Sequence, residues 1–352
     1  MRPISRRDFL KLSALALGSL AFTPFFPEIT GFEDTNLVRV ATKSVSVYRG
    51  PTDKSLIVAT WYRDDLVNVY AEITADEPKY NPVWYRVWGG YMHRARLQRV
   101  KVLYNKPLTA IPENGLLAEV TVPYSQAYVY NKWDGWKTTY RLYYGSVHWI
   151  VAVEPGPDGQ PWYRILDELD EATYHAPAIH LRHISPEEIA PITPDVPLEK
   201  KRIEVALNTQ TLTCYEYDQV VFQTNISSGI APLSSAGGTP TNTPVGKYNI
   251  IVKMPSKHMG IADLAASIYD YVLLGVPWCC FIKNINGEYH GVAFHGTYWH
   301  DNFSVPMSRG CINLRMADAK WLFRWTRPVA SFAEINPLTL DRKGYGTRVV
   351  IY

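Results

Sequence analysis

Two segments in the first half of the chain resemble each other, and this internal repeat restricts the possible folds more than any other feature. Each segment has an opening strand with a tyrosine, a turn rich in Gly, Pro or Asp, a β-branched strand, a Trp-Tyr-Arg strand and a closing Leu-x-x-[Val/Ile]. The β-branched strands are expected at residues 66–73 and 147–153, the Trp-Tyr-Arg strands at Trp84 and Trp162, and the closures at Leu97 and Leu181. Short alternating strands at this spacing are typical of small β-barrels. The sequence therefore predicts two such modules, at residues 36–100 and 101–184.

The repeated pattern resembles bacterial SH3-like modules, which often accompany cell-wall enzymes and are thought to bind wall peptides or glycan. The resemblance implies a binding role for both segments. Their many aromatic residues either line a ligand groove or fill the small cores, and the sequence leaves both interpretations open.

A proline-rich segment, residues 185–200, separates the repeat from the rest of the chain. It contains four prolines with interleaved carboxylates, which favours an extended, semi-rigid linker. From Lys201 the alternation of Ile203, Val205 and Leu207 again indicates strands. Helical patterns are expected only at residues 263–274 and 316–326. The fold class predicted for the whole chain is mainly β, with a C-terminal domain at residues 201–352.

The N-terminus contains a targeting signal, Ser5-Arg6-Arg7-Asp8-Phe9-Leu10-Lys11, followed by an apolar run to residue 26. It resembles a twin-arginine leader, which directs a folded protein across a bacterial or archaeal inner membrane. The alternatives are an ordinary secretory signal and an uncleaved anchor, although a run of about fifteen residues is short for a permanent span. We expect residues 1–30 to be this leader, membrane contact to be transient, and the mature chain to work in the periplasm or cell wall.

Charge and cysteine content exclude several classes of protein. Lys and Arg exceed Asp and Glu by three, and a leader removed near Ala21 takes four basic residues and one acidic residue with it. The mature chain is then close to neutral, which argues against a nucleic-acid or anionic-membrane partner. Four cysteines are too few for a disulfide scaffold in 352 residues. Cys214, Cys279 and Cys280 are therefore expected to be buried thiols.

The run from Val292 to Leu314, VAFHGTYWHDNFSVPMSRGCINL, contains the residue types that a thiol enzyme needs. A cysteine nucleophile reacts as the thiolate, which a nearby imidazole promotes, and backbone donors must hold the developing oxyanion. Cys311 supplies the thiol. His295 lies sixteen residues upstream at the end of an expected strand, so the intervening loop can return the ring to the sulfur. Gly310 allows a tight turn before Cys311. A buried structural cysteine and a packed histidine are the alternatives.

These residues resemble the YkuD family of L,D-transpeptidases, whose motif is a His, a loop, [Ser/Thr]-His-Gly-Cys, a hydrophobic residue and Asn or Arg. The matching residues here are His295, Gly296, Ser308, Gly310, Cys311, Ile312 and Asn313. Residues 203–229 resemble the family's opening strands, 243–248 its Thr-Pro-x-Gly turn and 346–352 its closing strand. The resemblance implies a β-sandwich catalytic domain with a few short helices.

Arg309 departs from the family motif, because the commonest form has a second histidine at this position. Arginine cannot act as a base near neutral pH. It can donate hydrogen bonds to a substrate carboxylate, and its charge favours a thiolate. The assignment of the base therefore depends on His295 alone.

The resemblance implies a two-step acyl transfer on peptidoglycan stem peptides. Cys311 attacks the third residue of a tetrapeptide donor, the terminal D-alanine leaves, and a thioester forms. The amine of an acceptor stem then attacks the thioester, while His295 carries the proton and the Gly296 carbonyl orients the imidazole. No metal or organic cofactor is expected, and the protein is expected to be a monomer.

Six further residues are predicted to bind substrate: Ser308, Arg309, Asn313, His300, Tyr298 and Met259. Each has a simpler interpretation. Ser308 is better suited to hydrogen bonding within its loop than to catalysis, and His300 either orders the loop or lies in a surface turn. Tyr298 and Trp299 either line the donor pocket or plug the loop. Residues 254–274, which include Met259, correspond to a flap in relatives or form a plain surface helix. The five-residue spacing of His290, His295 and His300 argues against a metal site.

Two rival functions remain at this point. A hydrolase or L,D-carboxypeptidase would use the same cysteine with water as the acceptor. A wall-binding protein would use the N-terminal modules, with a catalytic domain that has lost its activity.

Overall fold

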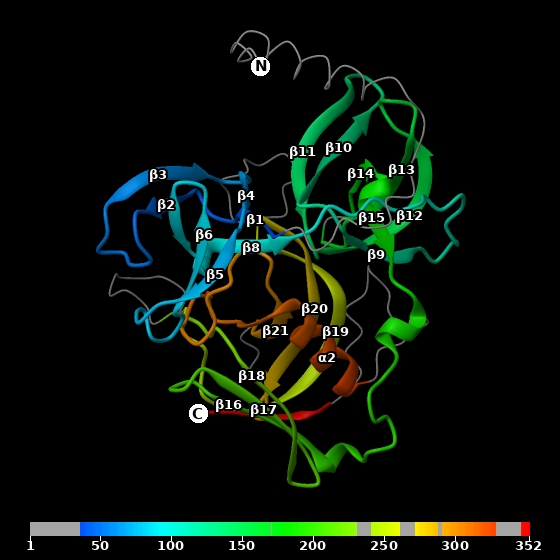
Figure 1. Ribbon diagram of the computed structural model, residues 1–352. Helices are drawn as coiled ribbons and strands as arrows, with labels where there is room; N and C mark the ends of the chain where they lie inside the picture. The colour runs from blue at the N-terminus through cyan, green and yellow to red at the C-terminus, as the bar shows by residue number, and fades with distance from the viewer. Residues whose placement is uncertain (1–35, 170, 231–240, 261–271, 288–290, 329–345) are drawn as a thin grey trace, which may run out of the picture. The chain divides into compact units, whose positions relative to one another are not determined.

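The computed structural model describes residues 36–169, 171–230, 241–260, 272–287, 291–328 and 346–352, all within one compact unit. These residues are mainly β, as predicted, with four sheets and a single α-helix among them (Figure 1). The predicted leader lies outside the described residues. No helix in the described ranges is long and apolar enough to cross a membrane.

Residues 36–100, here called module 1, contain two antiparallel sheets. One has the order β4 (Leu66–Asn68), β1 (Leu37–Val40), β8 (Leu97–Val100). The other has the order β3 (Ile57–Tyr62), β2 (Ser44–Tyr48), β7 (Gly90–His93), β6 (Val83–Val87), β5 (Ala71–Thr74), and the short helix η1 (Arg94–Arg96) connects β7 to β8. Alternate residues such as Val38, Val40 and Val47 turn inward to form one core.

Residues 101–184, here called module 2, contain one seven-stranded sheet. Its order is β11 (Gly135–Tyr143), β10 (Tyr124–Asn131), β14 (Thr173–Pro177), β13 (Pro161–Leu166), β12 (Val147–Pro155), β9 (Leu116–Val120), β15 (Leu181–His183). A short helix, η2 (Ala178–His180), precedes β15.

The aromatic residues of the repeat have equivalent packing in the two modules. Trp84 on β6 makes an edge contact with Tyr48 at 5.6 Å between ring centroids, and Trp162 on β13 makes one with Tyr128 at 5.2 Å. Both tryptophans are buried. The Trp-Tyr-Arg strands therefore fill cores, whereas Trp88 and Trp133 are each 81% exposed.

The C-terminal domain is built on an eight-stranded mixed sheet. Its order is β18 (Gln219–Asn225), β17 (Thr211–Glu216), β16 (Lys201–Ala206), β23 (Arg348–Ile351), β19 (Gly246–Gly260), β20 (Val272–Asn284), β21 (Ala293–Gly296), β22 (Ile312–Leu314). The pairs β16–β23 and β21–β22 are parallel. Helix α2 (Met316–Trp325) lies against β20 and buries Ala319, Leu322 and Phe323.

The expected helix at residues 263–274 is wrong where the structure describes it. Val272 to Leu274 begin strand β20, and residues 263–271 lie outside the described residues. Met259 pairs with Leu273 and Gly260 with Val272, so residues 254–260 also belong to a strand rather than to a surface helix. Backbone pairing with β19 decides the conformation here, because a short apolar run suits a strand as well as a helix.

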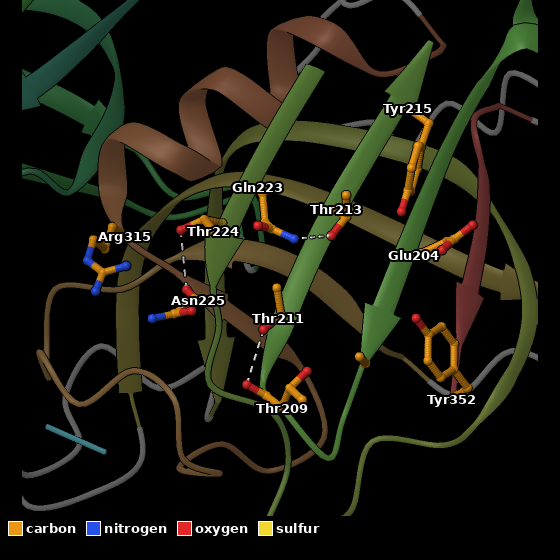
Figure 2. A pocket seen from close by; sticks show the side chains of 11 residues that line it. Glu204, Thr209, Thr211, Thr213, Tyr215, Gln223, Thr224, Asn225, Arg315 and Tyr352 are labelled. Carbon is orange, nitrogen blue, oxygen red and sulfur yellow. Dashed lines mark hydrogen bonds between the residues drawn. The ribbon is translucent and has the colours of Figure 1, made fainter. Parts of the chain in front are cut away.

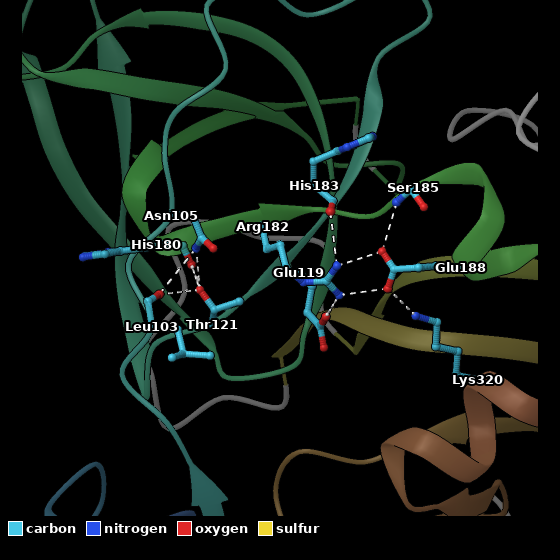
Figure 3. Close-up of polar contacts among 10 residues, drawn as sticks. All are labelled: Leu103, Asn105, Glu119, Thr121, His180, Arg182, His183, Ser185, Glu188 and Lys320. Carbon is cyan, nitrogen blue, oxygen red and sulfur yellow. Dashed lines mark hydrogen bonds and ion pairs between the residues drawn. The ribbon is translucent and has the colours of Figure 1, made fainter. Parts of the chain in front are cut away.

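The proline-rich linker is less extended than its sequence suggests. It forms two short helices, η3 (Pro186–Ile189) and η4 (Leu198–Lys200), and Ile189 is buried. Figure 3 shows how ion pairs fix it. Arg182 on β15 contacts both Glu119 on β9 and Glu188 on η3 at 2.7 Å, and Lys320 on α2 contacts Glu188 at 3.0 Å. The linker is thereby attached to both of its neighbours.

Candidate active site

The parallel pairing of β21 with β22 places the predicted base and nucleophile on adjacent strands. Phe294 pairs with Ile312 and His295 with Asn313. Cys311 directly precedes β22, opposite the start of β21. Residues sixteen apart in the sequence are therefore brought together by sheet register.

His295 is only 2% exposed, and its Nδ1 lies 3.0 Å from the Gly296 carbonyl oxygen. The carbonyl accepts the Nδ1 proton, which leaves Nε2 as the basic nitrogen. Burial lowers the pKa of His295 to about 4, although the hydrogen bond to Gly296 opposes this shift. The imidazole is therefore neutral and ready to accept a proton at neutral pH.

Cys311 is half-buried and packs against a buried apolar cluster that includes Cys279 and Ala293, and Met259, Leu273 and Trp299 pack against the same cluster. Its sulfur lies 3.9 Å from the Gly291 carbonyl oxygen. Burial raises the pKa of the thiol, and a hydrogen bond from the Ala293 backbone only partly offsets this. In the described part of the chain no hydrogen bond joins the sulfur to the His295 ring. The resting pair is a neutral thiol and a neutral imidazole.

A network of short hydrogen bonds shapes the turn before Cys311. Gly310 has φ +116°, a conformation that side-chain-bearing residues rarely adopt. The Ser308 hydroxyl donates to the Cys311 carbonyl at 2.5 Å and accepts the Gly310 N–H at 3.2 Å. Thr243 donates to the Gly310 carbonyl at 2.8 Å and accepts the Gly229 N–H at 2.8 Å. Thr243 was not among the predicted site residues, although the Thr-Pro turn was a usable signal.

His300 and Asn313 form a buried pair beneath the nucleophile loop. Nδ1 of His300 accepts the Asn302 N–H at 3.2 Å, and Nε2 lies 2.9 Å from the Asn313 side-chain amide. The Asn313 atom that faces Nε2 is Nδ2, and Asn313 Oδ1 is buried without a partner, so a half-turn of the amide would let Oδ1 accept the Nε2 proton. Burial, together with nearby Arg96, lowers the pKa of His300 to about 3. This is the arrangement of a loop-ordering hydrogen bond.

The remaining predicted site residues lie on both sides of this loop. Met259 packs on the same apolar cluster as Cys311, and the Trp299 ring is 5.7 Å from that of His295. Tyr298 is buried, with its hydroxyl donating to the Leu274 carbonyl at 2.9 Å. Arg309 is exposed. The structure therefore brings Trp299 close to His295, places Met259, Trp299 and Cys311 on one apolar cluster, and packs Tyr298 edge-on against Trp299.

The other three cysteines are buried free thiols, as predicted. Within the described ranges no three His, Cys, Asp or Glu side chains are grouped so that they could hold a metal ion. His290 lies outside those ranges.

A polar groove of about 650 Å³ lies on the outer face of β16, β17 and β18 (Figure 2). Leu212 and Cys214 point into the core, so Thr211, Thr213 and Tyr215 alternate onto the groove side. The groove is bordered by Arg315 and Tyr352 and includes neither Cys311 nor His295. It is separate from the candidate active site.

A mainly β domain that places a cysteine and a backbone-oriented histidine at two paired strands carries the residue types that thiol acyl transfer requires. Residues 200–351 match the family model YkuD, described as an L,D-transpeptidase catalytic domain. The chain therefore carries a YkuD-type L,D-transpeptidase catalytic domain, as the motif predicted.

Solved structures similar to this chain are also L,D-transpeptidases. One from Xylanimonas cellulosilytica has 22% identity and a TM-score of 0.29, with 43% of this chain and 60% of that chain covered. An Enterococcus faecium variant has 22% identity, a TM-score of 0.30 and coverages of 44% and 50%. One from Mycobacterium smegmatis has 18% identity, a TM-score of 0.29 and coverages of 44% and 58%. This chain thus spans about half to three fifths of those proteins. No curated protein matches the chain.

Proposed function

We propose that the protein is an exported peptidoglycan L,D-transpeptidase with Cys311 as nucleophile and His295 as base. The observation that supports this most is the β21–β22 register, which places His295 beside the Cys311 loop inside a YkuD-type domain. The twin-arginine leader supports export. We also propose that modules 1 and 2 are SH3-like and bind the wall.

The proposed reaction begins with a neutral pair. His295 Nε2 accepts the thiol proton as the Cys311 sulfur attacks the carbonyl of the third stem residue. The sulfur–carbon bond forms, the bond to the terminal D-alanine nitrogen breaks, and the leaving amine takes the proton from Nε2. The amine of a second stem then attacks the thioester and returns its proton through His295 to the thiol. The Gly296 carbonyl keeps Nδ1 protonated throughout.

Substrate groups would meet different residues around the sulfur. The Gly310 N–H already donates to Ser308, so we assign the oxyanion to the Cys311 N–H. Exposed Arg309 would bind a stem carboxylate. Met259 and Trp299 would pack on the donor stem. Ser308, Asn313 and His300 would act indirectly, by holding the loop.

The test is mass spectrometry of the products formed from purified disaccharide-tetrapeptide. The leaderless protein is compared with Cys311→Ala and with Cys214→Ala, which removes a buried thiol that lies in the core. We expect a cross-linked dimer from the unaltered protein and Cys214→Ala, and none from Cys311→Ala. Tripeptide without dimer would mean a carboxypeptidase. Identical inactivity of all three proteins would contradict catalysis and leave wall binding.

A further inference from the structure

All three parts of the described chain meet at one buried arginine of module 1. Arg39 on β1 is 2% exposed, and its guanidinium contacts Asp64 at 2.9 Å and Gln98 at 2.8 and 3.1 Å. It lies 4.0 Å from the ring centroid of Tyr143 in module 2. Its Nη2 also donates to the Tyr298 carbonyl oxygen at 3.0 Å. Arg39 thus connects both modules to the loop that follows β21.

A second contact from module 1 holds the same loop a few residues further on. The Asn81 side-chain nitrogen donates to the Asp301 carbonyl at 3.0 Å and to the Asn302 side-chain oxygen at 2.9 Å. The Asp301 N–H donates to the Ala95 carbonyl at 2.9 Å. Residues 298, 301 and 302 are therefore all fixed by module 1.

The loop held in this way carries residues that contact His295 and the strand that follows Cys311. The ring of Trp299, which directly follows the carbonyl that Arg39 binds, lies 5.7 Å from the His295 ring, and Trp299 packs on the same buried apolar cluster as Cys311. His300 bonds Asn313, two residues after Cys311. A displacement of this loop would therefore move the packing around both reacting groups.

We propose that Arg39 is a positioning residue, and that module 1 completes the active site by holding residues 297–302 against His295 and Cys311. This inference rests on the proposed function. A buried ion pair contributes little net stability compared with apolar packing. The planar guanidinium fork does, however, fix the directions of the groups it binds, and positioning requires this.

The test measures the loop and the thiol separately. Ertapenem, which acylates the catalytic domain of the Enterococcus faecium L,D-transpeptidase, serves as the probe. Attack by the Cys311 sulfur breaks the lactam carbon–nitrogen bond and the ring nitrogen takes the thiol proton, so the adduct has the summed mass of protein and drug. Mass spectrometry measures the rate at which this adduct forms, and a second experiment measures hydrogen exchange of residues 297–303. The variants are Arg39→Met, Asn81→Ala and the control Val47→Ala, which opens a cavity in the module 1 core.

We expect Arg39→Met and Asn81→Ala to slow acylation by about tenfold or more and to speed loop exchange, because small misplacements in a reacting pair have large effects on rate. Val47→Ala should lower thermal stability and change neither readout. If Arg39→Met does not fold, Asn81→Ala alone tests whether module 1 positions the loop, because this variant leaves the Arg39–Asp64 pair intact. Unchanged acylation with a protected loop, or equal slowing by Val47→Ala, would overturn the proposal. If the unaltered protein is not acylated, the proposed function fails, and loop exchange alone decides the positioning.

Discussion

Burial shifts the pKa values of the two groups proposed to react, Cys311 and His295, in opposite directions. It raises the pKa of the Cys311 thiol and lowers that of His295 to about 4. Both shifts favour the uncharged form, because a charged form in a desolvated position has few partners. The proposed reaction therefore starts from a neutral pair rather than from a thiolate–imidazolium pair. In it, His295 would take the proton during attack rather than before it.

Alkylation of Cys311 should show this resting state. We expect its rate of reaction with iodoacetamide to be low at pH 6 and to increase continuously through pH 9, since only the thiolate reacts. Peptide mass spectrometry after timed quenching measures it. Buried Cys214, Cys279 and Cys280 in the same sample serve as internal controls and should remain unmodified. A rate that already reaches a plateau below pH 7 would show an ion pair and contradict the assignment.

Gly310 offers a test of the turn that presents the nucleophile. An alanine Cβ at this position would meet nothing within 4 Å, so Gly310→Ala adds backbone strain at φ +116° without a clash. We expect a cost of about 1–3 kcal/mol in the free energy of unfolding and slower ertapenem acylation. Gly135→Ala, at φ +72° in the β10–β11 turn with the same open surroundings, is the matched control. Urea denaturation measures the loss of stability in both variants, and only Gly310→Ala should also slow acylation. Equal acylation rates in the two variants would contradict a role for the turn.

The residues proposed to react could be selected from the sequence because their motif is local. Cys311, Gly310 and His295 lie within one short run. Arg39 could not be predicted, since it bonds Tyr298 across 259 residues and no periodicity records such a contact. Thr243 is an intermediate case, because its turn was recognised but its bond to Gly310 was not.

At the scale of elements, alternation predicted strands well where one sheet face is buried. Ile203 and Val205 point into the core from β16, as their spacing indicated. The helix expected at residues 316–326 is α2, which ends at Trp325. Alternation did not predict strand β20. Residues 274 to 282 are buried on both faces of the sheet, so their sequence is a continuous apolar run without alternation.

Two lysines, Lys201, which is buried, and Lys253, which is partly buried, donate hydrogen bonds to the C-terminal end of α2. Lys253 on β19 donates to the carbonyls of Phe323 and Thr326 at 2.5 and 2.8 Å, and Lys201 donates to that of Trp325 at 3.1 Å. We expect Lys253→Met to lower the free energy of unfolding by about 1–3 kcal/mol, because two buried carbonyls lose their donor. Lys247→Met, at an exposed position on the same strand, should have little effect in the same urea titration.

The contribution of Lys253 to the free energy of unfolding should depend on pH, and the direction follows from its pKa. Burial lowers the pKa of Lys253 to about 8, below its ordinary value of about 10.4. Between these values the unfolded chain binds more protons than the folded protein, so this group makes stability increase with pH. The increase should be absent in Lys253→Met. A variant with the same slope as the unaltered protein would contradict the buried lysine's titration.

At the scale of the molecule, the boundaries read from composition do not separate independent cores. Leu117, Val147 and Trp149 of module 2 belong to the same hydrophobic cluster as Ile250 and Phe294 of the catalytic sheet. Such packing cannot be predicted from the sequence, because the hydrophobic character of a residue does not specify which distant residue it contacts. The sequence therefore does not predict the contacts that make residues 101–184 part of the catalytic core.

The ion pairs around Glu188 test this coupling through pH. Partial burial would raise the pKa of Glu188, but hydrogen bonds from Arg182 and Lys320 outweigh it and lower the pKa to about 2. A carboxylate with a depressed pKa stabilises the fold fully above its ordinary pKa of about 4.3, and this contribution is lost as the pH falls towards 2. Glu188→Gln should therefore be less stable at pH 7, by about 1 kcal/mol or less because the side chains are partly exposed to solvent.

The difference between Glu188→Gln and the unaltered protein should shrink as the pH falls from 5 to 2.5 in urea denaturation. Glu199→Gln, on the same linker at an exposed position, should follow the unaltered protein throughout. If the difference in stability between the two proteins were the same at pH 5 and pH 2.5, the charge of Glu188 would not contribute to holding the linker, and packing alone would hold it. Because Glu188 bonds residues of module 2 and α2 at once, a shrinking difference would show that acid weakens the attachment of the modules to the catalytic domain.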